Sequence, residues 1–130
     1  MINGKKLTPA EWEIMDAVWN LGASPSVRDV LEYAYPNGEK AYTTVQTLMN
    51  LLEKKGLLTR KKIGLVNFYT ATRQREEMIA SETRHLISRV FRGSAPALAN
   101  FLIAEENLSL DDIQNIKSLL KEKEKQLKEN

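Results

Sequence analysis

The chain has 130 residues, with 19 basic and 17 acidic side chains and no cysteine. A disulfide framework, a thiolate nucleophile and a cysteine-ligated zinc or copper site are therefore excluded, and the one histidine, His85, is too few for an all-imidazole metal centre. With 42% hydrophobic and 28% charged residues the composition is that of a folded domain, and a net charge of +2 does not by itself indicate a nucleic-acid partner.

Two predicted helices begin at capping sequences. Thr8-Pro9-Ala10-Glu11 combines a capping threonine with an acid three residues later and a proline where no amide hydrogen is needed. Apolar residues at helical spacing, including Trp12 and Trp19, then predict a helix with both tryptophans in the core, ended by Leu21-Gly22. Ser26-Val27-Arg28-Asp29 repeats the capping pattern and starts a second, shorter helix.

After the third predicted helix, the spacing of apolar residues changes from helical to strand-like. Apolar and polar side chains occupy opposite sides of a helix from Thr43 to Lys55, which Gly56 ends. Residues 57–62 and 67–72 are strand-like and are joined by residues 63–66. Three helices and a hairpin in this order predict a mainly α fold with a small β-hairpin, in which a winged helix-turn-helix precedes a helical region.

The polar side of the third helix suits the edges of bases in the major groove. Glutamine and asparagine pair with adenine through two hydrogen bonds, and threonine methyls pack on thymine methyls. Basic residues on the hairpin would contact phosphates. The residues that this pattern assigns to DNA are Thr43, Thr44, Gln46, Thr47, Asn50, Lys54, Arg60, Lys61 and Lys62. A solvated helix face remains the alternative, because winged helices also serve as protein-binding modules.

Charge is unevenly distributed along the chain. Residues 1–75 hold 11 basic and 7 acidic side chains, a net +4, whereas residues 76–130 hold 8 and 10, a net −2. The two halves are therefore expected to have different partners. The predicted domains are a winged-helix DNA-binding domain over residues 1–73 and a helical dimerisation region over residues 74–130.

The second half predicts three further helices. The first covers residues 76–92 and ends at Gly93-Ser94, a shorter one follows, and Ser109-Leu110-Asp111-Asp112 caps the last, whose charged end at residues 121–130 is expected to fray. About 55 residues in thin helices cannot bury their apolar side chains alone, so a homodimer is expected. The residues expected at its interface are Leu86, Val90, Phe91, Leu98, Phe101, Leu102, Ile113, Ile116 and Leu120.

Several segments in order carry a family resemblance. They cover residues 7–15, 44–48, 52–56 and 68–70 and continue through Asn100-Phe101 and residues 107–109. Together they resemble the penicillinase repressor family of bacterial transcriptional repressors (BlaI/MecI/CopY type). The resemblance implies a dimeric repressor of double-stranded operator DNA, in which Thr44, Gln46 and Thr47 match positions that contact the operator.

The chain departs from this family at two positions near the third helix. Leu51 stands where relatives usually carry an arginine, and loss of one phosphate-contacting cation should flatten the salt dependence of binding by about one charge equivalent. Tyr42, in front of the helix, is also unusual and is expected to touch sugar or phosphate. Copper-responsive relatives carry cysteine pairs near the C-terminus, and their absence here disfavours copper sensing.

Asn100 and Phe101 match the bond that a membrane sensor protease cuts in antibiotic-responsive members of the family. The resemblance therefore implies a sensor protease as a further partner and derepression by cleavage, which would remove the pairing surface of the dimer. The alternative is that Phe101 is a core residue and Asn100 an ordinary helix residue. His85 is expected at the surface or in an interface rather than as a metal ligand.

No arrangement of residues indicates catalysis. Glu105 and Glu106 are adjacent carboxylates, which on a helix point about 100° apart and do not face one substrate. No metal and no cofactor are expected. Residues 1–6 lack the apolar core of a signal peptide and no apolar run approaches 18 residues, which predicts a cytoplasmic protein without membrane insertion.

Overall fold

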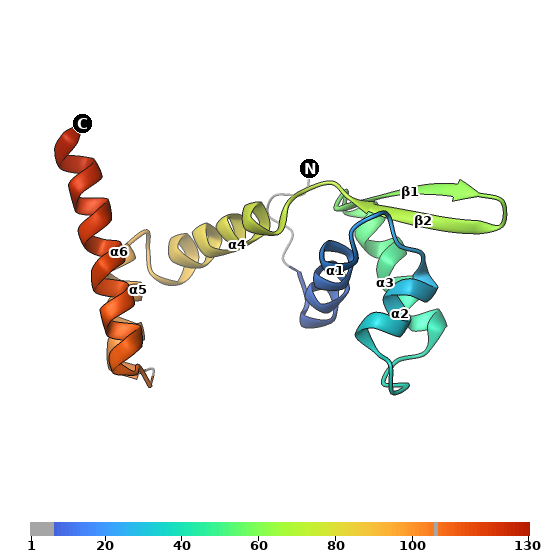
Figure 1. The fold of residues 1–130 in the computed structure, drawn as a ribbon, viewed down its shortest axis with the longest axis horizontal. Helices are drawn as coiled ribbons and strands as arrows, with labels where there is room; N and C mark the ends of the chain where they lie inside the picture. The colour runs from blue at the N-terminus through green and yellow to red at the C-terminus, as the bar shows by residue number, and fades with distance from the viewer. Residues whose placement is uncertain (1–6, 106) are drawn as a thin grey trace. The chain divides into compact units, whose positions relative to one another are not determined.

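The computed structural model describes residues 7–105 and 107–130, which form six helices and one antiparallel hairpin (Figure 1). The order is α1 (Pro9–Leu21), α2 (Val27–Ala34), α3 (Tyr42–Lys54), β1 (Leu58–Ile63), β2 (Val66–Ala71), α4 (Arg75–Val90), α5 (Ala95–Glu105) and α6 (Leu110–Glu129). The predicted fold class, mainly α with a small hairpin, is confirmed. Residues 1–6, on which the lack of a signal peptide was argued, and Glu106 lie outside the described residues.

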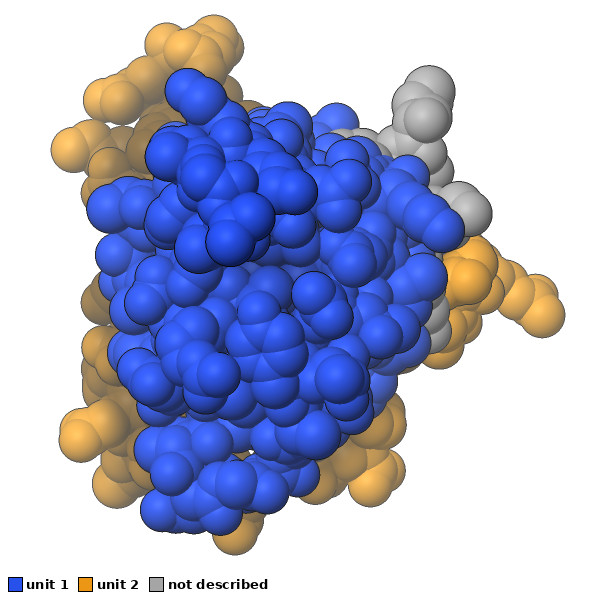
Figure 2. Space-filling model, turned by 90° about the vertical axis from the view of Figure 1, so that its right-hand side faces the viewer, with its two compact units in different colours: residues 1–85 blue, residues 86–130 orange. Residues whose placement is uncertain are grey.

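The chain divides into two compact units, residues 1–85 and 86–130, which Figure 2 colours separately. The boundary falls inside α4, because the beginning of this helix packs against the first unit. Met78 is buried there, and the backbone N–H of Leu7 donates a hydrogen bond to Glu82 Oε1 at 3.2 Å. The functional boundary between residues 73 and 74 stays a prediction, and the compact unit extends past it to include about two thirds of α4.

Both predicted capping boxes at the start of the chain are confirmed. Thr8 Oγ1 accepts from the N–H of Glu11 at 3.1 Å, and Glu11 Oε1 accepts from the N–H of Thr8 at 2.9 Å. Ser26 and Asp29 make the same reciprocal pair at the start of α2. These bonds satisfy amides that have no partner within the helix, so α1 and α2 begin where the sequence predicted.

Glu11 has a second role that joins the first helix to the third. Glu11 is only 2% exposed, and Lys55, the residue after α3, donates from Nζ to both carboxylate oxygens at 2.8 and 2.7 Å. Burial alone would raise the pKa of Glu11, but the bonds from Lys55 and Thr8 outweigh it and hold the pKa below its ordinary value of 4.5. The buried carboxylate is therefore charged and fixes the end of α3 against the start of α1.

Apolar side chains of α1, α2, α3 and the hairpin form one core in the first unit. Those buried in it include Ile14, Met15, Val18, Val30, Val45, Met49, Leu52, Leu58 and Tyr69. Trp12 and Trp19 pack against this core with ring centroids 6.0 Å apart, as expected of structural tryptophans. The core holds the three helices and the hairpin as one body.

The bounds of α3 and the hairpin differ slightly from the prediction. α3 begins at Tyr42, one residue earlier than predicted, and its N-cap residue, Ala41, makes no side-chain capping bond. It ends at Lys54, one residue before the predicted end, and Gly56 follows at φ +82°, a conformation that glycine adopts without strain. The strands run from the pair Leu58–Ala71 to the pair Ile63–Val66, one residue off the predicted limits, so the turn itself is shorter than expected.

The last three helices also follow the sequence closely. α4 and α5 are separated at the predicted break, and Ser109 and Asp112 form the third capping box at the start of α6. The expectation that residues 121–130 fray is wrong, because α6 continues to Glu129. Lys128 Nζ lies 3.8 Å from Glu124 Oε2, and this ion pair between residues four positions apart supports the exposed end of the helix. Of the helices in the described ranges, none combines the length and apolar character needed to cross a bilayer.

We predict that Lys55→Met lowers the free energy of unfolding by about 2–4 kcal/mol, because it leaves the buried carboxylate of Glu11 without its cation. Urea unfolding at neutral pH measures the change. The difference in the free energy of unfolding between Lys55→Met and the parent should shrink as the pH falls below 4.5. Protonation of Glu11 then removes the ion pair in the parent as well.

The matched control for this variant is Arg75→Met. It breaks the ion pair between Arg75 Nε and Asp16 Oδ1, which has the similar length of 2.9 Å but two solvent-exposed partners. The expected loss is below about 1 kcal/mol. Equal losses for the two variants would contradict the structural role given to Glu11.

Candidate nucleic-acid interface

The third helix has one buried and one exposed side. Val45, Met49 and Leu52 are fully buried in the core. Thr43, Thr47 and Lys54 project from the opposite side and are exposed. The side chains suited to base edges are therefore accessible along the helix.

The flank of α3 next to the hairpin is more constrained. Gln46 and Asn50 lie on it and are half-buried. Asn50 Oδ1 accepts a hydrogen bond from the hydroxyl of Tyr69 at 2.8 Å and a longer one from Arg60 Nη1 at 3.4 Å. The two-bond pairing with adenine that was expected of Asn50 needs this oxygen as well as the amide nitrogen. With the oxygen engaged, Asn50 offers its amide nitrogen alone in this structure, and its side chain joins α3 to the hairpin.

The opposite flank of α3 carries Thr44 and Leu51, which are two turns apart on the same side of the helix. Both are exposed, and Leu51 shows 43% of its surface to solvent. An apolar side chain at this place brings no charge toward a phosphate. It presents methyl groups instead, of the kind that contact a thymine methyl in the major groove.

Arg28 was missed by the sequence analysis. It lies in the first turn of α2, and its guanidinium carbon is 5.1 Å from the centre of the ring of Tyr42, the first residue of α3. In helix-turn-helix proteins the helix before the recognition helix crosses the phosphate backbone. The stacked pair therefore adds a cation and an aromatic hydroxyl to the beginning of the exposed face of α3. A basic residue two positions after the Ser26 cap was the available signal in the sequence.

The strand pairing separates the three cations of the hairpin. Arg60 pairs with Tyr69, Lys61 with Phe68 and Lys62 with Asn67. Directly paired residues share one face of a hairpin, and successive residues alternate between faces. Arg60 and Lys62 thus lie on the face of the buried Tyr69, toward α3, whereas Lys61 lies on the other face.

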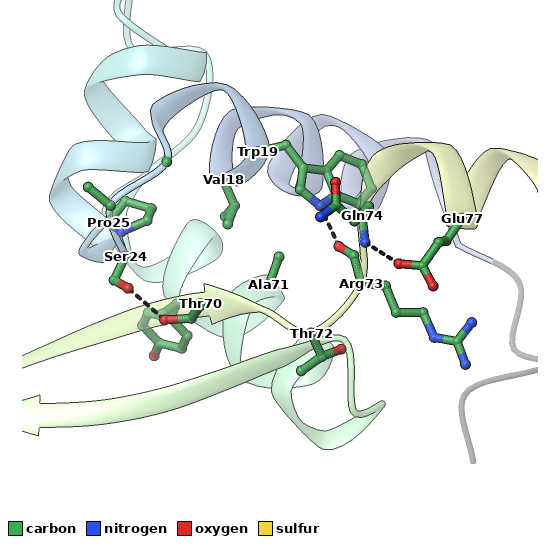
Figure 3. A pocket seen from close by; sticks show the side chains of 13 residues that line it. Val18, Trp19, Ser24, Pro25, Thr70, Ala71, Thr72, Arg73, Gln74 and Glu77 are labelled. Atoms are coloured by element: carbon green, nitrogen blue, oxygen red, sulfur yellow. Dashed lines mark hydrogen bonds between the residues drawn. The ribbon is translucent and has the colours of Figure 1, made fainter.

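A cavity of about 460 Å³ lies elsewhere in the first unit (Figure 3). Trp19 Nε1 donates to the carbonyl of Arg73 at 2.8 Å on one side of it, and the hydroxyls of Ser24 and Thr70 are 2.6 Å apart on another. The guanidinium of Arg73 extends away from these side chains. None of the residues assigned to DNA lines this cavity. Among the described residues, no three potential metal ligands lie together.

The residues assigned to dimerisation lie on α4, α5 and α6 and on the break before α5. Phe91 and Leu98 are half-buried, with the ring of Phe91 6.3 Å from that of Phe101. The other assigned residues are exposed, namely Leu86, Val90, Phe101, Leu102, Ile113, Ile116 and Leu120. Asn100 is also exposed and lies with Phe101 in the interior of α5.

A family model described as the penicillinase repressor matches residues 7–122. The chain belongs to the penicillinase repressor family. The resemblance seen in the sequence is thereby confirmed. The family consists of transcriptional repressors rather than enzymes.

The matching relatives span nearly the whole chain at low identity. The methicillin resistance regulatory protein MecI of Staphylococcus aureus is 25% identical over 118 residues, which cover 91% of this chain and 95% of MecI. The penicillinase repressor of Bacillus licheniformis is 24% identical over 124 residues, or 95% of this chain and 96% of that protein. An uncharacterized 16.5 kDa protein in the ptsI 3′ region of Latilactobacillus sakei is 33% identical over 118 residues, or 91% of this chain and 80% of that protein.

Among solved structures, a MarR family protein from Bacillus stearothermophilus is similar, with a TM-score of 0.49 and 19% sequence identity. The similarity covers 98% of this chain and 79% of that one. At this distance the similarity does not bear on function.

We predict that Tyr69→Phe lowers the free energy of unfolding by about 1 kcal/mol, because it removes the hydrogen bond from the buried hydroxyl to Asn50 and leaves the packing of the ring intact. Urea unfolding measures the loss. Tyr33→Phe changes an exposed tyrosine of the same unit and serves as the control, with no change expected. A loss that is the same for both variants would contradict the contact between α3 and the hairpin.

Proposed function

We propose that this chain is a sequence-specific DNA-binding transcriptional repressor that acts as a homodimer on a palindromic operator. One observation carries the proposal: the polar side of α3 is exposed, and it is bordered by Arg28 at its beginning and by the hairpin face with Arg60 and Lys62. The first 75 residues also carry the net charge of +4. A polar helix bordered by cations matches a recognition helix that enters the major groove between two phosphate backbones.

The residues divide by role. Thr43, Thr44, Gln46 and Thr47 are the side chains proposed to meet base edges. Arg28, Tyr42, Lys54, Arg60 and Lys62 are those proposed to meet sugar and phosphate, with Asn50 holding the hairpin in position beside them. Lys61, on the other face of the hairpin, remains a predicted phosphate contact.

The proposal for Leu51 is a contact with a thymine methyl group in place of a phosphate contact. Because a leucine releases no counterion, binding should depend on salt by about one charge equivalent less than with an arginine at this position. The preferred operator should then carry a thymine that a chain with arginine at this position would not require.

The proposed partner of the second unit is a second copy of this chain. No residue in the ranges 86–105 and 107–130 is buried, although α5 and α6 carry large apolar side chains at helical spacing. A soluble chain does not leave such a surface uncovered. Pairing two copies covers it and relates two α3 helices by a twofold axis, which is what a palindromic operator requires.

Cleavage between Asn100 and Phe101 is proposed as the route to derepression. The bond lies inside α5, so a protease would bind it only after this helix unwinds locally, and the two exposed side chains and the lack of buried residues in α5 keep that cost low. The cut would separate Phe101, Leu102 and all of α6 from the DNA-binding unit. Affinity for two half-sites depends on both being bound by one dimer, and would fall with the loss of pairing.

The experiment that tests this function is selection of duplexes from a random pool by the full chain, followed by fluorescence anisotropy with the selected and random duplexes at several salt concentrations. A repressor of this kind should prefer the selected duplex by at least about 1,000-fold, with affinity that falls steeply as salt rises. Equal binding to both duplexes, or no binding, would leave a winged-helix protein-interaction module as the function.

We predict that Gln46→Ala and Lys62→Ala change binding in different ways. Gln46→Ala should lower the preference for the selected duplex by about tenfold and leave binding to random duplex unchanged, since it removes a base contact. Lys62→Ala should weaken binding to both duplexes alike and reduce the salt slope by about one. Anisotropy titrations over a range of salt measure both effects.

Lys61→Ala is the matched variant for Lys62→Ala, because the two lysines are neighbours on opposite faces of β1. Lys61→Ala is expected to lower the affinity for both duplexes less than Lys62→Ala does. If Gln46→Ala and Lys62→Ala had the same effect on both duplexes, the roles given to α3 and the hairpin would be wrong.

We predict that a chain ending at Asn100 is a monomer at concentrations where the full chain is a dimer, and that it binds a two-half-site duplex about 100-fold more weakly. Sedimentation velocity and anisotropy provide the two measurements. A chain ending at Leu120 keeps every residue assigned to the interface and should remain dimeric. A dimer that survives truncation at Asn100 would refute the assignment of α5 and α6 to pairing.

A further inference from the structure

The tip of the hairpin exposes three large apolar side chains. Leu65 shows 94% of its surface to solvent, Ile63 58% and Val66 45%. The tip extends beyond α1, α2 and α3 in Figure 1, so none of these helices covers it. Leu65 is the most exposed of the large apolar side chains in the part of the chain that the structure describes.

The turn itself does not require these residues. Ile63 pairs with Val66, which leaves Gly64 and Leu65 as the two central residues of a tight turn. Of these two, only Gly64 has a positive φ, +63°, which is the arrangement of a type II′ turn with glycine first. The position of Leu65 accepts a small polar residue equally well, so its apolar character points to a contact outside the chain.

The charge of the hairpin indicates the chemistry of that contact. Three consecutive cations, Arg60, Lys61 and Lys62, precede the tip, and residues 58–71 contain no aspartate or glutamate. The hairpin therefore combines an apolar tip with charged side chains that are all cationic. Such a surface is complementary to a polyanion that also has an apolar crevice. The minor groove of DNA has this character, with phosphates along its edges and sugars and base edges inside.

The hairpin is also long enough to extend from the major-groove site of α3 to the neighbouring minor groove. Its base is tied to α3 through Asn50, whose oxygen accepts from both Tyr69 and Arg60. From Arg60 to Leu65 an extended strand spans about 17 Å. The centre of the neighbouring minor groove lies half a helical turn, also about 17 Å, along the duplex from the centre of the major groove.

We propose that Ile63, Leu65 and Val66 enter the minor groove beside the major-groove site of α3, with Leu65 as an apolar wedge between base pairs. This inference rests on the proposed DNA-binding function. An apolar wedge partly unstacks a base step, and pyrimidine–purine steps open with the least cost. The hairpin thereby gives the protein a preference for deformable sequence at a place where it makes no hydrogen bonds to bases.

The test uses the full chain and a selected duplex that carries 2-aminopurine at one position at a time on either side of the half-site. The parent should raise the fluorescence of 2-aminopurine at one flanking step, because the base there loses its stacking. Leu65→Ser should abolish this rise and weaken binding about tenfold, the effect of losing the burial of one leucine side chain. Its salt slope should stay unchanged, in contrast to Lys62→Ala, because no cation is lost.

Leu65→Met is the matched control, since it keeps an apolar side chain and should bind and raise the fluorescence as the parent does. Thermal melting of the free variants should equal that of the parent, because an exposed side chain contributes little to folding. If Leu65→Ser bound the selected duplex and changed the fluorescence as the parent does, the proposed wedge would be wrong. The proposed repressor function would not be affected. No preference of the parent for its selected duplex would overturn both.

A lipid surface has the same combination of negative charge and apolar interior. Binding to vesicles of phosphatidylcholine with and without phosphatidylglycerol distinguishes a lipid surface from DNA as the partner of the tip. The proposal expects no difference between the parent and Leu65→Ser in binding to either vesicle. Binding to the anionic vesicle that Leu65→Ser abolishes, together with unchanged binding to DNA, would assign the tip to a membrane and overturn the minor-groove contact.

Discussion

The carboxylate of Glu11 is the constraint on which the arrangement of the first unit depends. It caps the N-terminus of α1 through Thr8 and at the same time holds Lys55 at the end of α3, so one buried charge fixes two helices. A buried carboxylate without partners would cost several kcal/mol, and here both oxygens are paired. The core buries Val45, Met49 and Leu52 on one side of α3, and this ion pair fixes the end of the helix, so the polar side of α3 faces outward.

The hairpin depends on a second connection, made by Asn50 on the neighbouring flank of α3. Its side-chain oxygen accepts from the buried hydroxyl of Tyr69 on β2 and from Arg60 on β1. The cations and the apolar tip of the hairpin are therefore fixed relative to the side chains of α3 that are proposed to face bases. Such pre-organisation lowers the entropy that ordering a loop would cost on binding.

Local signals in the sequence predict most of the fold. Capping boxes, a glycine after α3 and helical spacing involve residues within four positions of each other, and they locate the starts of α1, α2 and α6 and both limits of α3 to within one residue. The contacts that build the interface are different in kind. Lys55 and Glu11 are 44 residues apart and Tyr69 and Asn50 are 19 apart, so only the tertiary fold brings them together. The sequence therefore predicted the exposed threonines but not that Asn50 is engaged or that Arg28 stacks on Tyr42.

The central claim is that α3 lies in the major groove with its threonines and Gln46 against base edges. It is tested most directly by replacing single purines of a selected duplex with 7-deazapurines, which lack the N7 acceptor that only the major groove presents. The full chain should lose affinity at purines in two half-sites whose centres are about 10 bp, or a multiple of one turn, apart. Affinity unchanged by 7-deaza substitution at every purine would show that α3 does not read the major groove.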